Sequence, residues 1–146
     1  MNAILEPAVA ASPVPEPVPD TVSPHEAWAL FTAGLALLVD VRTWEELTFV
    51  GHVPGSLHVP WATGTSLTRN PRFARELEAK VGIKSQRVLL LCRSGKRSAL
   101  ALDAARAAGF TQVSNVREGF EGELDARQQR GHGDGWRFHG LPWTQD

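Results

Sequence analysis

The chain has little of what disulfide-bonded, zinc-thiolate or nucleic-acid-binding proteins need. It contains one cysteine, Cys92, one methionine and no tyrosine in 146 residues. A single cysteine excludes an intramolecular disulfide and a zinc site made of several thiolates, and it suits a reducing, cytoplasmic compartment. The formal net charge is only -1, so no basic field attracts nucleic acid or an anionic membrane. The five histidines show no metal-ligand spacing, and we expect neither a metal nor a cofactor.

The N-terminal stretch lacks the features of a targeting or membrane-spanning segment. It has no cationic region and no sustained apolar run, which a signal peptide or a membrane span requires. Its Pro- and Ala-rich composition favours extended, solvated conformations. We therefore predict a disordered tail over residues 1–21 and a single domain over 22–146, with 127–146 as a C-terminal extension.

Helix and strand signals alternate along the predicted domain. S-P-H-E at 23–26 and T-W-E-E at 43–46 are capping boxes, which mark helix starts. We predict helices between Ser23 and Gly34, between Thr43 and Gly51, between Asn70 and Gly82, over 98–108 and over 119–129, and strands over 35–41, 57–59, 88–91 and 113–116. Short strands that alternate with helices favour parallel pairing through crossover connections. The predicted fold is α/β, an open, mainly parallel sheet flanked by helices on both faces.

The only thiol directly follows a predicted buried strand. V-L-L-L at 88–91 runs into Cys92 and then R-S-G-K-R-S at 93–98. Ligands bind where parallel strands end, and a tight turn before a helix N-terminus points backbone N–H groups at an anion. These dipoles and the nearby cations favour the thiolate. We predict that Cys92 is a nucleophile in an anion cradle formed by Arg93, Ser94, Gly95, Lys96, Arg97 and Ser98. The alternative is a buried structural cysteine beside a solvated helix start.

The cysteine loop resembles the active-site loop of the rhodanese-like sulfurtransferases, and three further segments agree in order. L-V-D-V-R at 38–42 resembles that family's first core strand with its Asp-x-Arg. G-H-V-P-G-S at 51–56 is similar to its Gly-His-Ile-Pro-Gly-Ala turn, and E-G-F-E-G at 118–122 resembles its late Gly-Gly-x-x-x-Trp segment. The resemblance runs from Val22 to about Asp125. Glu118 and Leu124 stand near the positions of a glycine and a tryptophan in many relatives.

The resemblance implies a thiosulfate sulfurtransferase that works through a persulfide on Cys92. The donor is thiosulfate or another sulfane-sulfur compound, and the acceptor is a small thiol, cyanide or a protein thiol. Arg93 and Arg97 would grip the sulfonate end of the donor, and Lys96 would add diffuse attraction. Neither a cofactor nor a nucleic-acid or membrane partner is implied.

Other residues and function classes leave alternatives open. Asp40 and Arg42 either brace the cysteine loop or form a surface ion pair, and Trp44 is predicted in the core. The aromatic residues of 127–146 either cover apolar surface or form a lid. A non-catalytic sulfur-carrier or regulatory module is the alternative function. A phosphatase or arsenate reductase is disfavoured, because the phosphatases that resemble this family have a longer loop between cysteine and arginine.

Overall fold

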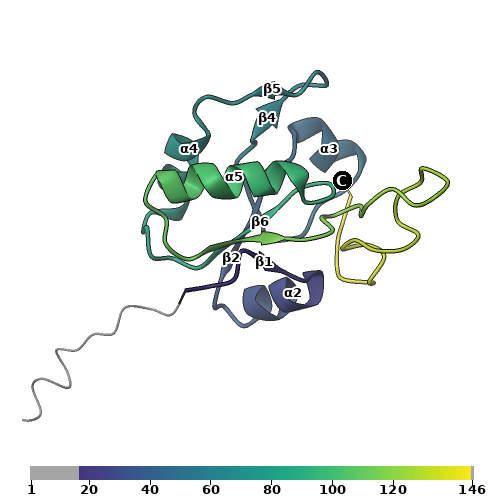
Figure 1. Ribbon diagram of the computed structural model, residues 1–146, viewed down its shortest axis with the longest axis horizontal. Helices are drawn as coiled ribbons and strands as arrows, with labels where there is room; N and C mark the ends of the chain where they lie inside the picture. The colour runs from purple at the N-terminus through teal and green to yellow at the C-terminus, as the bar shows by residue number, and fades with distance from the viewer. Residues whose placement is uncertain (1–16, 146) are drawn as a thin grey trace, which may run out of the picture.

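Five short parallel strands form the central sheet of the computed structural model, which describes residues 17–145 (Figure 1). Their order across the sheet is β1 (Thr21–Val22), β7 (Val113–Val116), β6 (Val88–Leu91), β2 (Leu37–Asp40) and β3 (Leu57–His58). Strand β6 pairs with β2 on one side and β7 on the other, and all four of its residues are buried. A continuous apolar run is typical of such a central parallel strand. The predicted parallel sheet is confirmed.

Helices cover both faces of the sheet, as predicted. They are α2 (Pro24–Thr32), α3 (Trp44–Phe49), α4 (Phe73–Val81) and α5 (Lys96–Ala107). Successive strand residues point to opposite faces, so Val39 and Leu90 pack with residues of α4 and α5, whereas Leu38 and Leu91 pack with residues of α2. Figure 1 shows α4 and α5 on one side of the sheet and α2 on the other. None of the described helices has the length and apolar character needed to cross a bilayer.

Both predicted capping boxes are present. The Thr43 hydroxyl accepts a hydrogen bond from the Glu46 backbone N–H, and the Glu46 carboxylate accepts one from the Thr43 N–H. The same exchange links Ser23 and Glu26 at the start of α2. The Thr43–Glu46 capping box starts α3 soon after the carboxyl end of β2, which brings Glu46 to the edge of the sheet where Cys92 lies.

The predicted helix over 119–129 is wrong, because tertiary contacts hold this segment in turns. Glu118, Gly119 and Gly122 have φ values of 73°, 69° and 91°, and a right-handed helix cannot contain this left-handed conformation. The Phe120 N–H donates to the Cys92 carbonyl at 2.7 Å, and the Glu121 N–H donates to the Arg93 carbonyl at 2.9 Å. The segment therefore packs as a turn against the cysteine loop.

Two further differences concern the surface around that loop. Trp44, predicted in the core, is 69% exposed, because the short helix α3 buries Leu47 instead. The antiparallel pair β4 (Ala62–Thr63) and β5 (Thr68–Arg69) was not predicted. This hairpin is anchored where the Arg69 guanidinium stacks over the Trp61 ring, 4.4 Å from its centroid.

Contacts with the domain begin before the predicted boundary at Val22, and the C-terminal extension packs on the domain. Residues 1–16 of the predicted tail lie outside the described part, but ordered contacts begin before Val22. The Asp20 carboxylate pairs with Arg106 at 2.7 Å, and Thr21 belongs to β1. In the C-terminal extension, Trp136 is fully buried on the α2 face. This confirms that Trp136 covers apolar surface.

Candidate active site

The Cys92 sulfur lies beside the N-terminus of α5. Strand β6 ends at Leu91, and the loop turns at Gly95, which has φ 102° and is the N-cap of the helix. Two groups donate hydrogen bonds to Sγ, the Gly95 backbone N–H and the Ser98 hydroxyl, each at 3.1 Å. Free N–H groups at a helix N-terminus stabilise an anion. The loop therefore presents two donors to a thiolate, and the predicted position of Cys92 is confirmed.

A buried polar network extends behind the sulfur. The Ser98 hydroxyl oxygen lies within hydrogen-bond distance of both Sγ and the Asn115 side-chain carbonyl, and the Asn115 amide donates to the Gly95 carbonyl at 3.1 Å. A hydroxyl has one proton but two acceptor lone pairs. Ser98 therefore turns its proton to Sγ when Cys92 is a thiolate, and to Asn115 when Cys92 is a thiol. Asn115 was not predicted; its only signal is an amide side chain near the carboxyl end of the buried strand β7.

Arg97 forms a two-pronged ion pair with Glu46. The two Nη–Oε distances are 2.6 and 2.7 Å, and the side chains are 13% and 17% exposed. Burial by itself would raise the pKa of Glu46, but the hydrogen bonds from Arg97 and from the Thr43 N–H lower this pKa to about 2. For Arg97, burial would lower the pKa, but Glu46 and, more weakly, the Cys92 charge raise it. The terminal nitrogens of Arg97 bind Glu46 in this structure, and the predicted grip of Arg97 on a donor stays a prediction.

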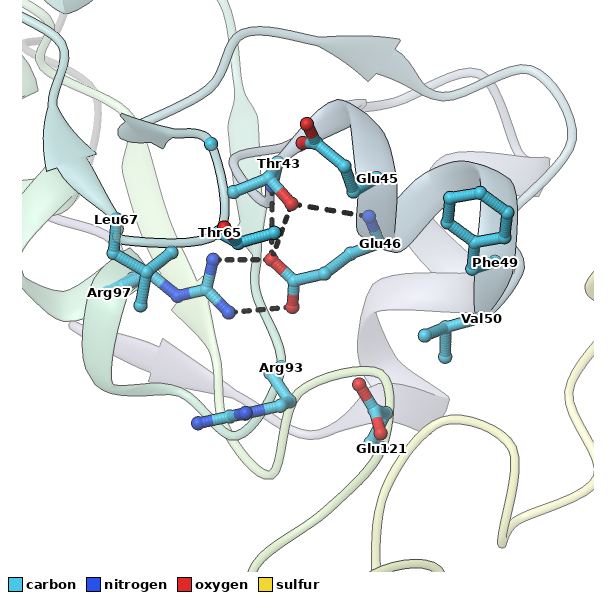
Figure 2. A pocket seen from close by; sticks show the side chains of 11 residues that line it. Thr43, Glu45, Glu46, Phe49, Val50, Thr65, Leu67, Arg93, Arg97 and Glu121 are labelled. Carbon is cyan, nitrogen blue, oxygen red and sulfur yellow. Dashed lines mark hydrogen bonds and ion pairs between the residues drawn. The ribbon is translucent and has the colours of Figure 1, made fainter.

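A cavity of about 410 Å³ opens beside the loop (Figure 2). Its walls come from α3, from the β4–β5 connection and from the cysteine loop, and the lining residues are Thr43, Glu45, Glu46, Phe49, Val50, Gly64, Thr65, Leu67, Arg93, Arg97 and Glu121. Arg93 and Arg97 line it, whereas Ser94, Gly95, Lys96 and Ser98 do not.

Cys92 does not line this cavity either, and it is only 1% exposed. It lies in the apolar core on the α5 side of the sheet. Arg93, the next residue in the chain, is exposed and lines the cavity. A molecule in the cavity therefore reaches the sulfur only when the loop shifts.

Asp40 and Arg42 form a fully buried ion pair, so the surface-pair alternative is wrong. Their side chains are 0% exposed and 2.7 Å apart, and Arg42 also donates to the Gly51 carbonyl at 2.8 Å. The Arg42 guanidinium lies 4.2 Å from the centroid of the Phe120 ring. Phe120 in turn donates its N–H to the Cys92 carbonyl. The pair thus touches the cysteine loop through Phe120.

The turn after β7 also ties the loop to the C-terminal extension. Glu118, with φ 73°, accepts hydrogen bonds from the Gly135 N–H at 3.0 Å and from His139 at 2.7 Å. Burial by itself would raise the pKa of Glu118, but these two hydrogen bonds lower it below its usual value. At Gly119, an added Cβ would lie 2.5 Å from the Ser94 nitrogen and closer still to the Arg93 carbonyl. The departure from the rhodanese pattern at Glu118 thus has a structural role, since this side chain anchors the extension.

Comparisons with known proteins agree with this geometry. The model of the Rhodanese-like domain family matches residues 23–125. Thiosulfate sulfurtransferase 16, chloroplastic, of Arabidopsis thaliana is 32% identical over 127 residues, which cover 86% of this chain and 92% of that protein. The Senescence-associated protein DIN1 of Raphanus sativus is 35% identical over 115 residues, 77% of this chain and 59% of that protein, so the chain spans less than two thirds of its length.

Solved structures give the same result. The crystal structure of Rv0390 from M. tuberculosis is similar with a TM-score of 0.77 and 41% identity, covering 86% of this chain and 97% of that one. The late turn, the Asp-x-Arg strand and the cysteine loop all lie within the residues that the family model matches. The chain belongs to the Rhodanese-like domain family.

Proposed function

We propose that this protein is a sulfurtransferase that moves a sulfane sulfur from thiosulfate or a similar donor to a thiophilic acceptor through a persulfide on Cys92. The observation that carries the proposal is the pair of donors on Sγ, the Gly95 N–H and the Ser98 hydroxyl at 3.1 Å. Such donors stabilise a sulfur anion without a change in position. A thiolate and a persulfide are both sulfur anions, so one cradle serves both states.

Each half of the reaction is a displacement at sulfur. The Cys92 thiolate attacks the outer sulfur of the donor, a new S–S bond forms, and the old S–S bond breaks so that sulfite leaves with the bonding electron pair. The acceptor, a small thiol, cyanide or a protein thiol, then attacks the terminal sulfur and Cys92 leaves as the thiolate. Sulfur moves without an external oxidant or reductant. The similarity to a protein named Thiosulfate sulfurtransferase 16 supports this reaction class.

Phosphate chemistry fits the site less well. The Arg97 guanidinium already gives two of its N–H groups to the Glu46 carboxylate, so fewer remain on this side chain for the several oxygens of a phosphoryl group. The carrier-module alternative uses the same persulfide and differs only in receiving its sulfur from a protein donor.

One preparation with two substrates tests the proposal. Thiosulfate with cyanide yields thiocyanate, whereas an aryl phosphate yields phosphate, and Cys92→Ser is the control that removes contaminating activity. We expect Cys92→Ser to abolish thiocyanate formation, because a hydroxyl does not ionise near neutral pH. We also expect no phosphate release that depends on Cys92. Thiocyanate formation by the variant at the rate of the unchanged protein would contradict the proposal.

A further inference from the structure

The mouth of the cavity is apolar on two sides. Phe49 on α3 is 74% exposed and Leu67 on the β4–β5 connection is 45% exposed, and both line the cavity. Figure 2 shows them on opposite sides of the Arg97–Glu46 pair. A small, strongly hydrated oxyanion gains nothing from two apolar side chains at the entrance. An apolar substituent that enters between them would remove their surface from water.

The backbone at Leu67 supports a specific role for this side chain. Its φ of 55° is left-handed, a conformation that is costly for residues other than glycine, and such costs concentrate at functional sites. The hairpin that carries Leu67 is fixed by the stacking of Arg69 on Trp61. The leucine is therefore held at the rim by a structured element.

The charges inside the cavity suit one negative charge better than two. Arg97 is neutralised by Glu46 at 2.6 Å. Arg93 has no carboxylate partner within residues 17–145 and is the guanidinium left for a ligand. Glu45 also lines the cavity and repels further anionic charge, whereas the charge of Glu121 is partly offset by Arg137 at 3.9 Å. A donor with a single negative charge avoids most of this repulsion, whereas the thiosulfate dianion does not.

We propose that the donor site selects organic sulfane-sulfur monoanions with an apolar substituent, that is, thiosulfonates or organic persulfides, over thiosulfate. Phe49 and Leu67 determine this specificity by packing on the substituent, and Arg93 binds the charged end. The inference rests on the proposed function. With a thiosulfonate, the cysteine loop shifts so that the sulfur reaches the donor, the Cys92 thiolate bonds to the terminal sulfur of the donor, the S–S bond of the donor breaks, and a sulfinate leaves with the electron pair. With an organic persulfide, the leaving group is the thiolate.

Three donors that differ in charge and apolar size test this selection. We compare kcat/KM for three donors, thiosulfate, methanethiosulfonate and benzenethiosulfonate, with cyanide as the acceptor. The kcat/KM of each donor is divided by the rate constant of its uncatalysed reaction with cyanide, which corrects for the intrinsic reactivity of the donor. We expect the corrected values to rise from thiosulfate through methanethiosulfonate to benzenethiosulfonate. In Phe49→Ala and in Leu67→Gly, the ratio of benzenethiosulfonate to thiosulfate should fall about tenfold, the lower end for lost apolar contact in a partly open site.

The glycine variant keeps the left-handed backbone at position 67, so it removes the side chain without straining the hairpin. Leu100→Ala is the matched control, because Leu100 is 55% exposed on α5 and does not line the cavity; its donor ratio should equal that of the unchanged protein. A higher corrected kcat/KM for thiosulfate than for benzenethiosulfonate, or an unchanged ratio in both cavity variants, overturns this inference and leaves the sulfurtransferase proposal standing. If no donor places sulfur on Cys92, both proposals fall.

Discussion

Gly119→Ala should disturb the active-site loop more than a glycine replacement at an open position. Gly119 has φ 69°, and a new Cβ would lie 2.5 Å from the Ser94 nitrogen, in a place already filled by the loop backbone. The left-handed conformation costs alanine about 1–2 kcal/mol, and overpacking adds about 1–3 kcal/mol. We therefore expect a loss of about 2–5 kcal/mol in the free energy of unfolding, together with a shift of the Arg93–Ser94 peptide.

Gly34→Ala is the matched control, because Gly34 has φ 75° and nothing within 4 Å of an added Cβ. The free energy of unfolding of Gly34→Ala should fall only by the conformational cost of about 1–2 kcal/mol, and the variant should keep its activity. Urea unfolding followed by tryptophan fluorescence measures stability, and kcat/KM for thiocyanate formation measures function. For Gly119→Ala we expect kcat/KM to fall by about a hundredfold, the scale for misplaced catalytic groups. Equal stability and equal activity in the two variants would refute the contact between turn and loop.

Three other substitutions test separate parts of the account. Asp40→Asn leaves the buried Arg42 charge unpaired and should cost about 3–5 kcal/mol in urea unfolding; a loss near zero would contradict the buried pair. Because the pKa of Glu46 is lowered from 4.5 to about 2, its ion pair with Arg97 stabilises the fold above pH 4.5 and is lost as the pH falls toward 2. After allowance for screening, this ion pair contributes about 2 kcal/mol to the free energy of unfolding. Glu46→Gln should therefore flatten the part of the stability–pH curve between pH 4.5 and 2, and an unchanged curve would contradict the ion pair. Trp136→Ala should lower the free energy of unfolding by about 3–5 kcal/mol, whereas the loss would be close to zero if Trp136 belonged to a surface lid.

Local signals in the sequence were enough to predict most of the sheet and the nucleophile. The capping boxes at Ser23 and Thr43 depend on residues three positions apart, and both form as predicted. The apolar run into Cys92 likewise marks a buried strand followed by a loop. These features need no knowledge of distant parts of the chain.

The errors arise where distant residues decide the structure. Arg97 and Glu46 are 51 positions apart, so the sequence showed a capping residue and a free cation but not their pairing. Residues 119–129 have helix-forming composition, yet backbone hydrogen bonds to the cysteine loop hold the start of this segment in turns. Phe49 and Leu67 meet at one cavity only after the hairpin folds beside α3.

The most direct test of the account is the stoichiometry of sulfur on Cys92. The protein is incubated with thiosulfate, freed of excess donor, weighed intact by mass spectrometry and mapped by peptides, and then treated with cyanide while thiocyanate is measured. We predict a gain of one sulfur atom per chain on Cys92, its complete discharge into an equal amount of thiocyanate, and no gain in Cys92→Ser. No added sulfur on the unchanged protein, or equal loading of Cys92→Ser, would contradict the claim that Cys92 carries the transferred sulfur.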